Sequence, residues 1–127
     1  MLPTTREWVL KAEGDYDVVL LLLRSRKRGR HDPTCFHAQQ CVEKYLKGRL
    51  TEAAIPFAKT HDLDELLNLA LPVERRWTAF SGQFGVMSLY AVLPRYPGMT
   101  VSVADARTAV ATCRRFRTLA RQSLGLK

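Results

Sequence analysis

The chain has 127 residues, 46% of them hydrophobic and 25% charged; this length fits one domain, and this composition excludes a disordered protein. No apolar run approaches the ~18 residues that cross a bilayer, and the N-terminus lacks a basic region followed by a hydrophobic signal core, so we expect a cytoplasmic protein with no membrane partner. Twenty Lys and Arg against twelve Asp and Glu give a formal net charge of +8, which favours acidic partners.

Apolar periodicity predicts a first helix near the N-terminus. Thr4 and Glu7 have the spacing of a capping box, and apolar residues then recur at three- and four-residue steps as far as the arginine-rich segment 24–30, where Gly29 marks a turn. This basic segment and a second one over 114–127 indicate either a surface for phosphate-bearing or acidic partners or a well-solvated surface.

Two further helices are predicted in the middle of the chain. Asp32 followed by Pro33 is typical of a helix start, because a carboxylate caps the first turn and proline at the first helical position has no N–H to satisfy. We expect this helix to end at Pro56. Asp62 then predicts the cap of a third, short helix, with Glu65 at the capping-box position.

The last third of the chain predicts a fourth helix over about 73–92 and a fifth that begins after Ser102. Gly82 and Gly85 weaken the fourth, since each glycine costs ~1 kcal/mol in a helix interior, whereas Ser102 and an aspartate three residues later form a capping box for the fifth. Short connections between such helices predict an all-α fold: an up-and-down bundle of four to five antiparallel helices, in one domain over residues 1–127.

The three cysteines, Cys35, Cys41 and Cys113, form no CxxC pair and have no zinc-like spacing. We therefore expect buried free thiols, and we expect neither a metal site nor a cofactor. The sequence also contains no phosphate-cradling glycine loop, no Ser-His-Asp arrangement and no carboxylate cluster suited to Mg²⁺.

Polar residues lie unusually close to the apolar face of the second predicted helix. Gln39 and Glu43 are an i,i+4 pair beside the apolar stripe, and we expect both to approach another helix. A further polar track at helical spacing consists of His37, Gln40, Lys44 and Lys47. Because buried amides and carboxylates are costly unless they are paired, the pattern indicates a polar network or an interface; a helix with two solvated edges is the alternative.

Three motifs occur in order along the chain. Residues 36–47 contain Phe-His-Ala-Gln-Gln followed by Glu-Lys and Leu-Lys, residues 60–63 are Thr-His-Asp-Leu, and residues 90–98 contain Tyr90 and then Arg-Tyr-Pro-Gly. These segments resemble the second-helix signature of the HEPN family, the element that follows it, and the family's arginine–tyrosine–proline segment. Residues 8–15 also fit the first helix of that family. The resemblance covers nearly the whole chain.

This resemblance implies a helical bundle, commonly dimeric, that is similar to the helical domain accompanying nucleotidyltransferases. Family members are often encoded beside a minimal nucleotidyltransferase, and in such pairs one member can be a toxin and the other its neutraliser. Many members are metal-independent ribonucleases that use an arginine followed closely by a histidine, contributed by both subunits. In this chain no histidine follows Arg95.

The resemblance therefore favours a module that binds nucleotide or RNA and acts with a separately encoded nucleotidyltransferase, within a toxin–antitoxin pair. We expect the bound phosphate near Arg95, because a guanidinium binds phosphate bidentately. Tyr90 and Tyr96 would offer stacking or hydroxyl groups there, and Lys44 and Lys47 would add positive charge.

Two other functions fit the sequence. One is a ribonuclease in which Arg95 works with His61, or with Tyr96 across a dimer. The other is a structural dimer without a ligand, in which Arg95 pairs with an internal carboxylate. In that case His61 would be structural too, as one member of a polar network made of Gln39, Glu43, His61 and Asp62.

Two surfaces are candidates for a partner. The last predicted helix carries a basic stripe that suits an RNA backbone or an acidic protein face, with a solvated helix face as the alternative, at Arg107, Arg114, Arg117 and Arg121. The fourth predicted helix offers an apolar dimer face through Phe80, Phe84, Val86 and Met87.

Overall fold

The computed structural model describes residues 1–93 and 96–127. Within these residues the chain forms helices and connecting loops without any strand, which confirms the all-α fold. The helices are α1 (Pro3–Arg24), α2 (His31–Glu52), α3 (Leu63–Ala70), the 3₁₀ helix η1 (Arg75–Phe80), α4 (Ser81–Ser88), the 3₁₀ turn η2 (Leu89–Ala91) and α5 (Val103–Ser123). None of the helices described is long and apolar enough to span a membrane.

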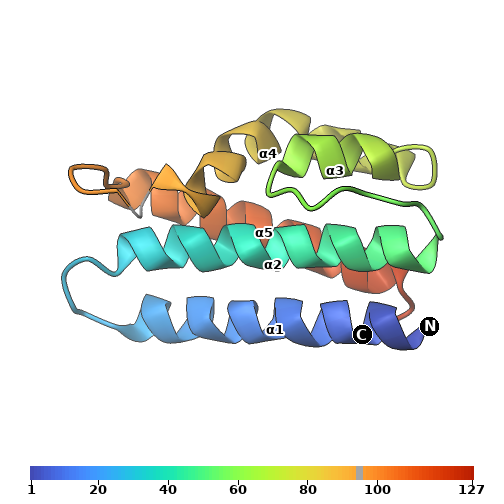
Figure 1. Ribbon diagram of the computed structural model, residues 1–127. Helices are drawn as coiled ribbons and strands as arrows, with labels where there is room; N and C mark the ends of the chain where they lie inside the picture. The colour runs from blue at the N-terminus through green and yellow to red at the C-terminus, as the bar shows by residue number, and fades with distance from the viewer. Residues whose placement is uncertain (94–95) are drawn as a thin grey trace.

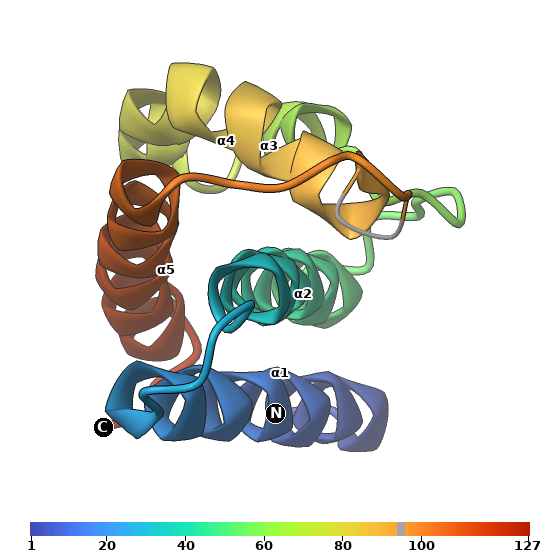
Figure 2. The ribbon, with the colours of Figure 1, turned by 90° about the vertical axis from the view of Figure 1, so that its left-hand side faces the viewer.

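The central helix of the bundle is α2. Seen from one end of the bundle, it has α1 on one side, α5 on another, and α3 with α4 on a third (Figure 2). Its apolar side chains are fully buried because these neighbours cover most of its circumference, as at Ala38, Val42, Tyr45, Leu46 and Leu50. The polar side chains on the covered part of α2 consequently lie inside the bundle as well.

Consecutive α-helices alternate in direction except at one connection, from α2 to α3 (Figure 1). α1 and α2 are antiparallel, as are α3 and α4, but the loop 53–62 returns along α2 before α3 begins (Figure 1). α5 therefore runs in the same direction as α2, and both begin at the end of the bundle where α1 ends. The segment 25–30 and the described part of the loop that leads into α5 lie at this same end (Figure 2).

An aromatic cluster joins η1 and α4 to α5. The Phe116 ring makes edge-to-face contacts, with centroid distances of 4.8 to 5.3 Å, to Trp77, Phe80 and Phe84. Each such pair contributes about 0.5–1.5 kcal/mol beyond the area that it buries. The predicted dimer face is therefore wrong for Phe80, Phe84 and Met87, which belong to the core, whereas Val86 is 55% exposed.

The start of α1 differs from the prediction. Its N-cap is Leu2 and no side chain caps it locally, so the capping box predicted at Thr4 and Glu7 is wrong. Glu52, at the end of α2, accepts hydrogen bonds from the Leu2 N–H and from Thr5 Oγ1, both at 2.9 Å. A carboxylate from the neighbouring helix thus satisfies a backbone donor at the start of α1, in place of a local side-chain cap.

The start of α2 is also displaced, because the helix begins at His31 and Asp32 is not its cap. Asp32 Oδ1 accepts hydrogen bonds from the Val101 N–H at 2.9 Å and from Thr100 Oγ1 at 3.2 Å. The carboxylate therefore joins the start of α2 to the chain that leads into α5. Pro33 stands within the first turn, where its missing N–H would have had no helical partner.

The end of α2 is set by backbone hydrogen bonds and not by Pro56. The helix ends at Glu52, and Ala54 adopts a left-handed conformation with φ 57°. The Ile55 N–H then donates to the Leu50 carbonyl at 2.9 Å. This is the Schellman arrangement, in which the bond from beyond the left-handed residue satisfies a carbonyl of the last turn.

Two predicted caps are confirmed. Asp62 accepts hydrogen bonds from the N–H groups of Asp64 and Glu65, at 3.0 and 3.2 Å, and α3 follows it directly. Ser102 and Asp105 form the predicted capping box of α5, in which each side chain accepts from the backbone N–H of the other. Both caps depend on residues three positions apart or fewer, and this is why the sequence indicates them.

The single helix predicted over about 73–92 is wrong, since this region is divided into η1, α4 and η2. Gly85 marks a close approach between α4 and α3. A Cβ atom added at Gly85 would lie 2.9 Å from Asp64 Oδ2, whereas one at Gly82 would meet nothing within 4 Å. Packing against α3 therefore accounts for the glycine at position 85 and not for the one at position 82.

All three cysteines are buried free thiols, as predicted. Burial, together with the charges of Asp105 and Asp32, raises the pKa of Cys35 to about 12. A hydrogen bond with Cys113, together with burial, raises the pKa of Cys41 well above its ordinary value. Both thiols are therefore protonated at neutral pH and unsuited to nucleophilic chemistry.

Candidate functional site

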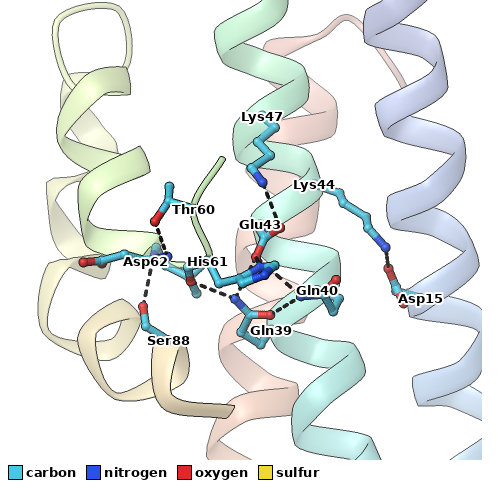
Figure 3. Close-up of polar contacts among 11 residues, drawn as sticks. Asp15, Gln39, Gln40, Glu43, Lys44, Lys47, Thr60, His61, Asp62 and Ser88 are labelled. Carbon is cyan, nitrogen blue, oxygen red and sulfur yellow. Dashed lines mark hydrogen bonds and ion pairs between the residues drawn. The ribbon is translucent and has the colours of Figure 1, made fainter. Parts of the chain in front are cut away.

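The carboxylate of Glu43 lies at the centre of a polar network in the bundle. Glu43 is 3% exposed. Its Oε1 accepts hydrogen bonds from Gln39 Nε2 at 3.1 Å and from His61 Nδ1 at 2.8 Å, and its Oε2 lies 3.0 Å from Lys47 Nζ (Figure 3). We call these four residues the Glu43 network. Since burial of a carboxylate is costly unless the group is paired and hydrogen-bonded, these contacts offset the cost of burying Glu43.

Helical spacing and one loop bring the Glu43 network together. Gln39, Glu43 and Lys47 are successive i,i+4 positions on α2, so they share one face. His61 comes from the loop 53–62, whose backbone Gln39 Nε2 also holds through the His61 carbonyl at 3.0 Å. Gln40 Nε2 supports the arrangement by donating to Gln39 Oε1 at 2.7 Å.

Asp62 belongs to the loop and not to the Glu43 network. Its side chain caps α3, while its N–H donates to Thr60 Oγ1 at 3.1 Å. Next along the chain, the Leu63 N–H donates to Ser88 Oγ at 2.8 Å (Figure 3). These bonds fix the backbone on either side of His61 and so orient its imidazole ring.

The imidazole ring of His61 is the part of the Glu43 network that reaches solvent. Its side chain is 63% exposed, whereas that of Glu43 is 4% exposed. With Nδ1 bonded to Glu43, the Nε2 atom has no partner among the described residues. A buried carboxylate that orients an exposed imidazole can support proton transfer at that free nitrogen.

Lys44 and His37 contact a second buried carboxylate. Asp15 of α1 is 8% exposed; Lys44 Nζ lies 2.5 Å from its Oδ2, and His37 Nδ1 lies 2.8 Å from its Oδ1. This role of Asp15 was not predicted from the sequence. A signal was present, because Asp15 falls on the same helical stripe as the buried Ala12 and Val19.

Both lysines predicted to bind phosphate are therefore paired within the chain. Lys47 is 7% exposed, bonded to Glu43, and its Nζ lies 5.6 Å from the ring centroid of Trp8 and 6.0 Å from that of Phe57. Lys44 is bonded to Asp15. Because each ammonium group already faces a carboxylate, neither offers an uncompensated charge to a phosphate.

Of the four arginines in the predicted basic stripe on α5, two are bonded within the chain and two are exposed. Arg117 forms a two-pronged bond with Glu13 of α1, at 2.7 Å from Nε and 2.6 Å from Nη2, and Arg121 Nη1 donates to Tyr45 Oη at 3.1 Å. Burial alone would raise the pKa of Glu13, but the hydrogen bonds from Arg117 and Tyr45 and the two arginine charges lower it below its ordinary value. The other two arginines of the stripe are exposed, at Arg107 and Arg114.

Of the three residues predicted to bind nucleotide within 90–98, the structure describes Tyr90 and Tyr96. Arg95 is outside the described residues. Tyr96 is 57% exposed, whereas Tyr90 is 7% exposed, and burial with the charges of Cys35 and Asp105 raises its pKa to about 12.

Tyr90 forms one wall of a hollow of about 250 Å³ that also includes Leu89, Leu93, Met99 and Thr100. The described lining of this hollow includes no member of the Glu43 network, so the predicted site residues fall into two separate groups.

Comparison with known proteins adds one finding. A family model described as HEPN domain matches residues 5–123, nearly the whole chain. No curated protein and no solved structure matches the chain significantly. The matched range contains the Glu43 network, the Asp15 carboxylate with its partners Lys44 and His37, and the hollow beside Tyr90.

Proposed function

The chain belongs to the HEPN family, and from this premise we propose that it is a binding module for nucleotide or RNA that acts with a separately encoded nucleotidyltransferase, within a toxin–antitoxin pair. The observation that carries the proposal is the hollow beside Tyr90. Its lining includes Leu93 and Met99, and Arg95 and Tyr96 lie between these two residues in the sequence. Its volume of about 250 Å³ lies just below the ~300–1,000 Å³ of typical ligand pockets, so it suits a base and not a whole dinucleotide.

In this proposal the base occupies the hollow and Tyr96 covers it. The apolar walls and the Tyr90 ring favour a flat aromatic ligand, and base–aromatic stacking contributes about 1–3 kcal/mol. The guanidinium of Arg95 would bind the attached phosphate. Lys44 and Lys47 are left out of this site, because both are paired with buried carboxylates.

The test is nucleotide binding, measured by titration of a fluorescent adenine nucleotide and of labelled RNA into the purified chain. Val86 lines the hollow and is 55% exposed, so Val86→Glu should fill it, repel phosphate and weaken binding about tenfold or more. Val73→Glu is the matched control, because Val73 is 43% exposed and lies outside the hollow. Equal binding by both variants would reject the hollow as the ligand site.

A metal-independent ribonuclease is the second candidate, favoured by the exposed His61 imidazole that Glu43 orients. We expect RNA cleavage in the presence of a chelator to be lost in His61→Ala and kept in Lys59→Ala, which changes an exposed residue of the same loop. An Arg95→Ala variant tests the predicted partner. Absence of cleavage by the unmodified chain would rule this candidate out.

We also propose that the chain forms a homodimer. A dimer is compatible with the binding module, and it is the expected state if the protein is structural and has no ligand. The exposed leucines of α1 offer an apolar face, since Leu10 is 72% and Leu21 is 65% exposed and the two lie about three helical turns apart. Light scattering over a concentration series should show a dimer that Leu10→Glu with Leu21→Glu converts to a monomer. A monomeric unmodified chain would reject the dimer.

A further inference from the structure

The segment between α1 and α2 carries cations that the fold does not use. Five of the seven residues in 24–30 are basic and none is acidic: Arg24, Arg26, Lys27, Arg28 and Arg30. Among the described residues none of them forms an ion pair, and the only hydrogen bond from any of their side chains is a weak one, from Arg30 Nη1 to the Lys27 carbonyl at 3.4 Å.

A small hollow lies beside this segment, between the start of α2 and the start of α5. It measures about 120 Å³ and is lined on its polar side by Arg30, His31, Thr34 and Arg107. Arg107 is exposed and also has no ion pair among the described residues. Arg30, the N-cap of α2, and Arg107, on α5, therefore line one hollow whose lining contains no carboxylate. The remainder of its lining is apolar and consists of Leu22, Leu23, Val103 and Ala106. We call the five cations of 24–30 together with Arg107 the basic end.

The carboxylates two positions along the chain from Arg30 and Arg107 already accept hydrogen bonds from other groups. Asp32 bonds to the Val101 N–H and to Thr100, and Asp105 closes the capping box with Ser102. The starts of α2 and α5 and the end of α1 meet here, so the helix dipoles contribute charge of both signs (Figure 2). The basic end thus combines unpaired arginines with a hollow.

We propose that the basic end binds the phosphodiester backbone of single-stranded RNA, with one phosphate in the hollow between Arg30 and Arg107. A hollow of about 120 Å³ is too small for a nucleoside but suits a phosphate group, which two guanidinium groups can bind bidentately. Phosphates on either side of the seated one then lie along Arg24, Arg26 and Arg28.

This inference rests on the proposed function and names RNA, not a free nucleotide, as its ligand. The two hollows flank the same stretch of chain, because Val101 and Asp105 line the one beside Tyr90 whereas Val103 and Arg107 line the one at the basic end. A single strand can therefore place a base beside Tyr90 and pass its backbone across the start of α5. A mononucleotide would occupy only the first hollow.

The experiment measures binding of a labelled oligouridine to the full chain by fluorescence anisotropy over a series of salt concentrations. Arg30→Gln with Arg107→Gln should weaken binding about tenfold or more at low salt, since both charge-assisted hydrogen bonds to the seated phosphate are lost. The slope of log affinity against log salt should fall by about 0.7 for each phosphate contact that is lost. Arg26→Gln with Arg28→Gln, confined to an exposed loop, should lower the slope without any effect on folding.

Arg75→Gln with Arg76→Gln is the matched control. Both arginines are exposed and without an ion pair among the described residues. They belong to η1, which begins toward the opposite end of the bundle (Figure 1). If this double variant and the Arg30–Arg107 double variant lose RNA affinity equally, the loss depends only on net charge, and the inference is overturned. Full retention of RNA binding by the Arg30–Arg107 pair would overturn it as well, while leaving the proposed function intact.

Competitors separate the remaining explanations. If polyglutamate displaces the labelled RNA as effectively as unlabelled RNA does, the basic end binds acidic proteins, and the inference is overturned. Equal affinity for oligothymidine would support recognition of the backbone through phosphate alone. Binding of a mononucleotide without any binding of RNA would remove this inference only, whereas binding of neither would remove the proposed function too.

Discussion

Cations inside the bundle and cations at its basic end are used in opposite ways. Lys44, Lys47 and Arg117 each face a carboxylate of the same chain at 2.5 to 3.0 Å. The five cations of 24–30 and Arg107 face none among the described residues. A buried charge without a partner costs several kcal/mol, so the interior requires pairing, whereas water solvates an exposed arginine at little cost. The excess positive charge of the chain, +8, is therefore available to a ligand mainly at the basic end, where no carboxylate of the described residues pairs with it.

The largest expected effect is at the centre of the interior group. Glu43→Ala would leave Lys47 buried without its carboxylate and His61 without its orienting partner, so we expect a loss of about 3–5 kcal/mol in the free energy of unfolding. Urea unfolding followed by circular dichroism measures it. Glu7→Ala, at an exposed position of α1, is the control and should change stability by less than about 0.5 kcal/mol. A Glu43→Ala protein as stable as this control would show that the network does not hold the bundle together.

A second prediction compares the same substitution, lysine to methionine, in the interior of the bundle and at the basic end. Lys47→Met should cost about 2 kcal/mol, because Glu43 loses one charge-assisted hydrogen bond but keeps those from Gln39 and His61. Lys27→Met, in the exposed segment, should cost almost nothing. Thermal unfolding of the two variants side by side gives the difference, and similar midpoints would contradict the contrast drawn between buried and exposed lysines.

The ion pair of Glu13 with Arg117 predicts a dependence on pH. Because the folded state lowers the pKa of Glu13 below its ordinary 4.5, its contribution is fully present above about pH 4.5 and is lost as the pH falls through the lower, folded pKa. Glu13→Gln should therefore be about 1 kcal/mol less stable than the unmodified chain at neutral pH, and this deficit should shrink in acid. Asp17→Asn, at an exposed position of α1, should show no such convergence. A deficit that is independent of pH would mean that the charge of Glu13 is not what stabilises the pair.

The smallest effect is expected at the basic end. Arg26→Gln with Arg28→Gln should leave the free energy of unfolding unchanged within about 0.5 kcal/mol, with a slight gain at low salt because neighbouring like charges repel each other. Differential scanning calorimetry at two salt concentrations tests this. A clear loss of stability would show that these arginines have a structural role and would weaken the contrast with the interior.

The sequence predicts features that depend on nearby residues and misses those that depend on distant ones. The caps at Asp62 and Ser102 are correct because donor and acceptor lie within one turn. The caps predicted at Thr4 and Asp32 are wrong because the carboxylates concerned bond between elements that are distant in sequence. Glu52 of α2 bonds to the start of α1, and Asp32 bonds to the chain that leads into α5.

The same distinction separates the predicted site residues. Gln39 and Glu43 meet because an i,i+4 spacing brings them together, and the loop motif supplies His61. Lys44 and Lys47 have the expected position on α2, but their use depends on Asp15 and on the burial of Glu43, and both follow from packing. Charge and spacing alone do not distinguish a lysine that binds a ligand from one that neutralises a buried carboxylate.

The burial of the Glu43–Lys47 pair also limits how this protein can diverge. Replacement of either residue alone passes through a destabilised chain, so we expect the two positions to change together, toward another matched pair or toward two apolar residues. Arg26 and Arg28 face no such limit, because each can be lost singly without harm to the fold. Basic residues that persist there among descendants of this sequence would therefore be retained by selection for binding and not by selection for stability.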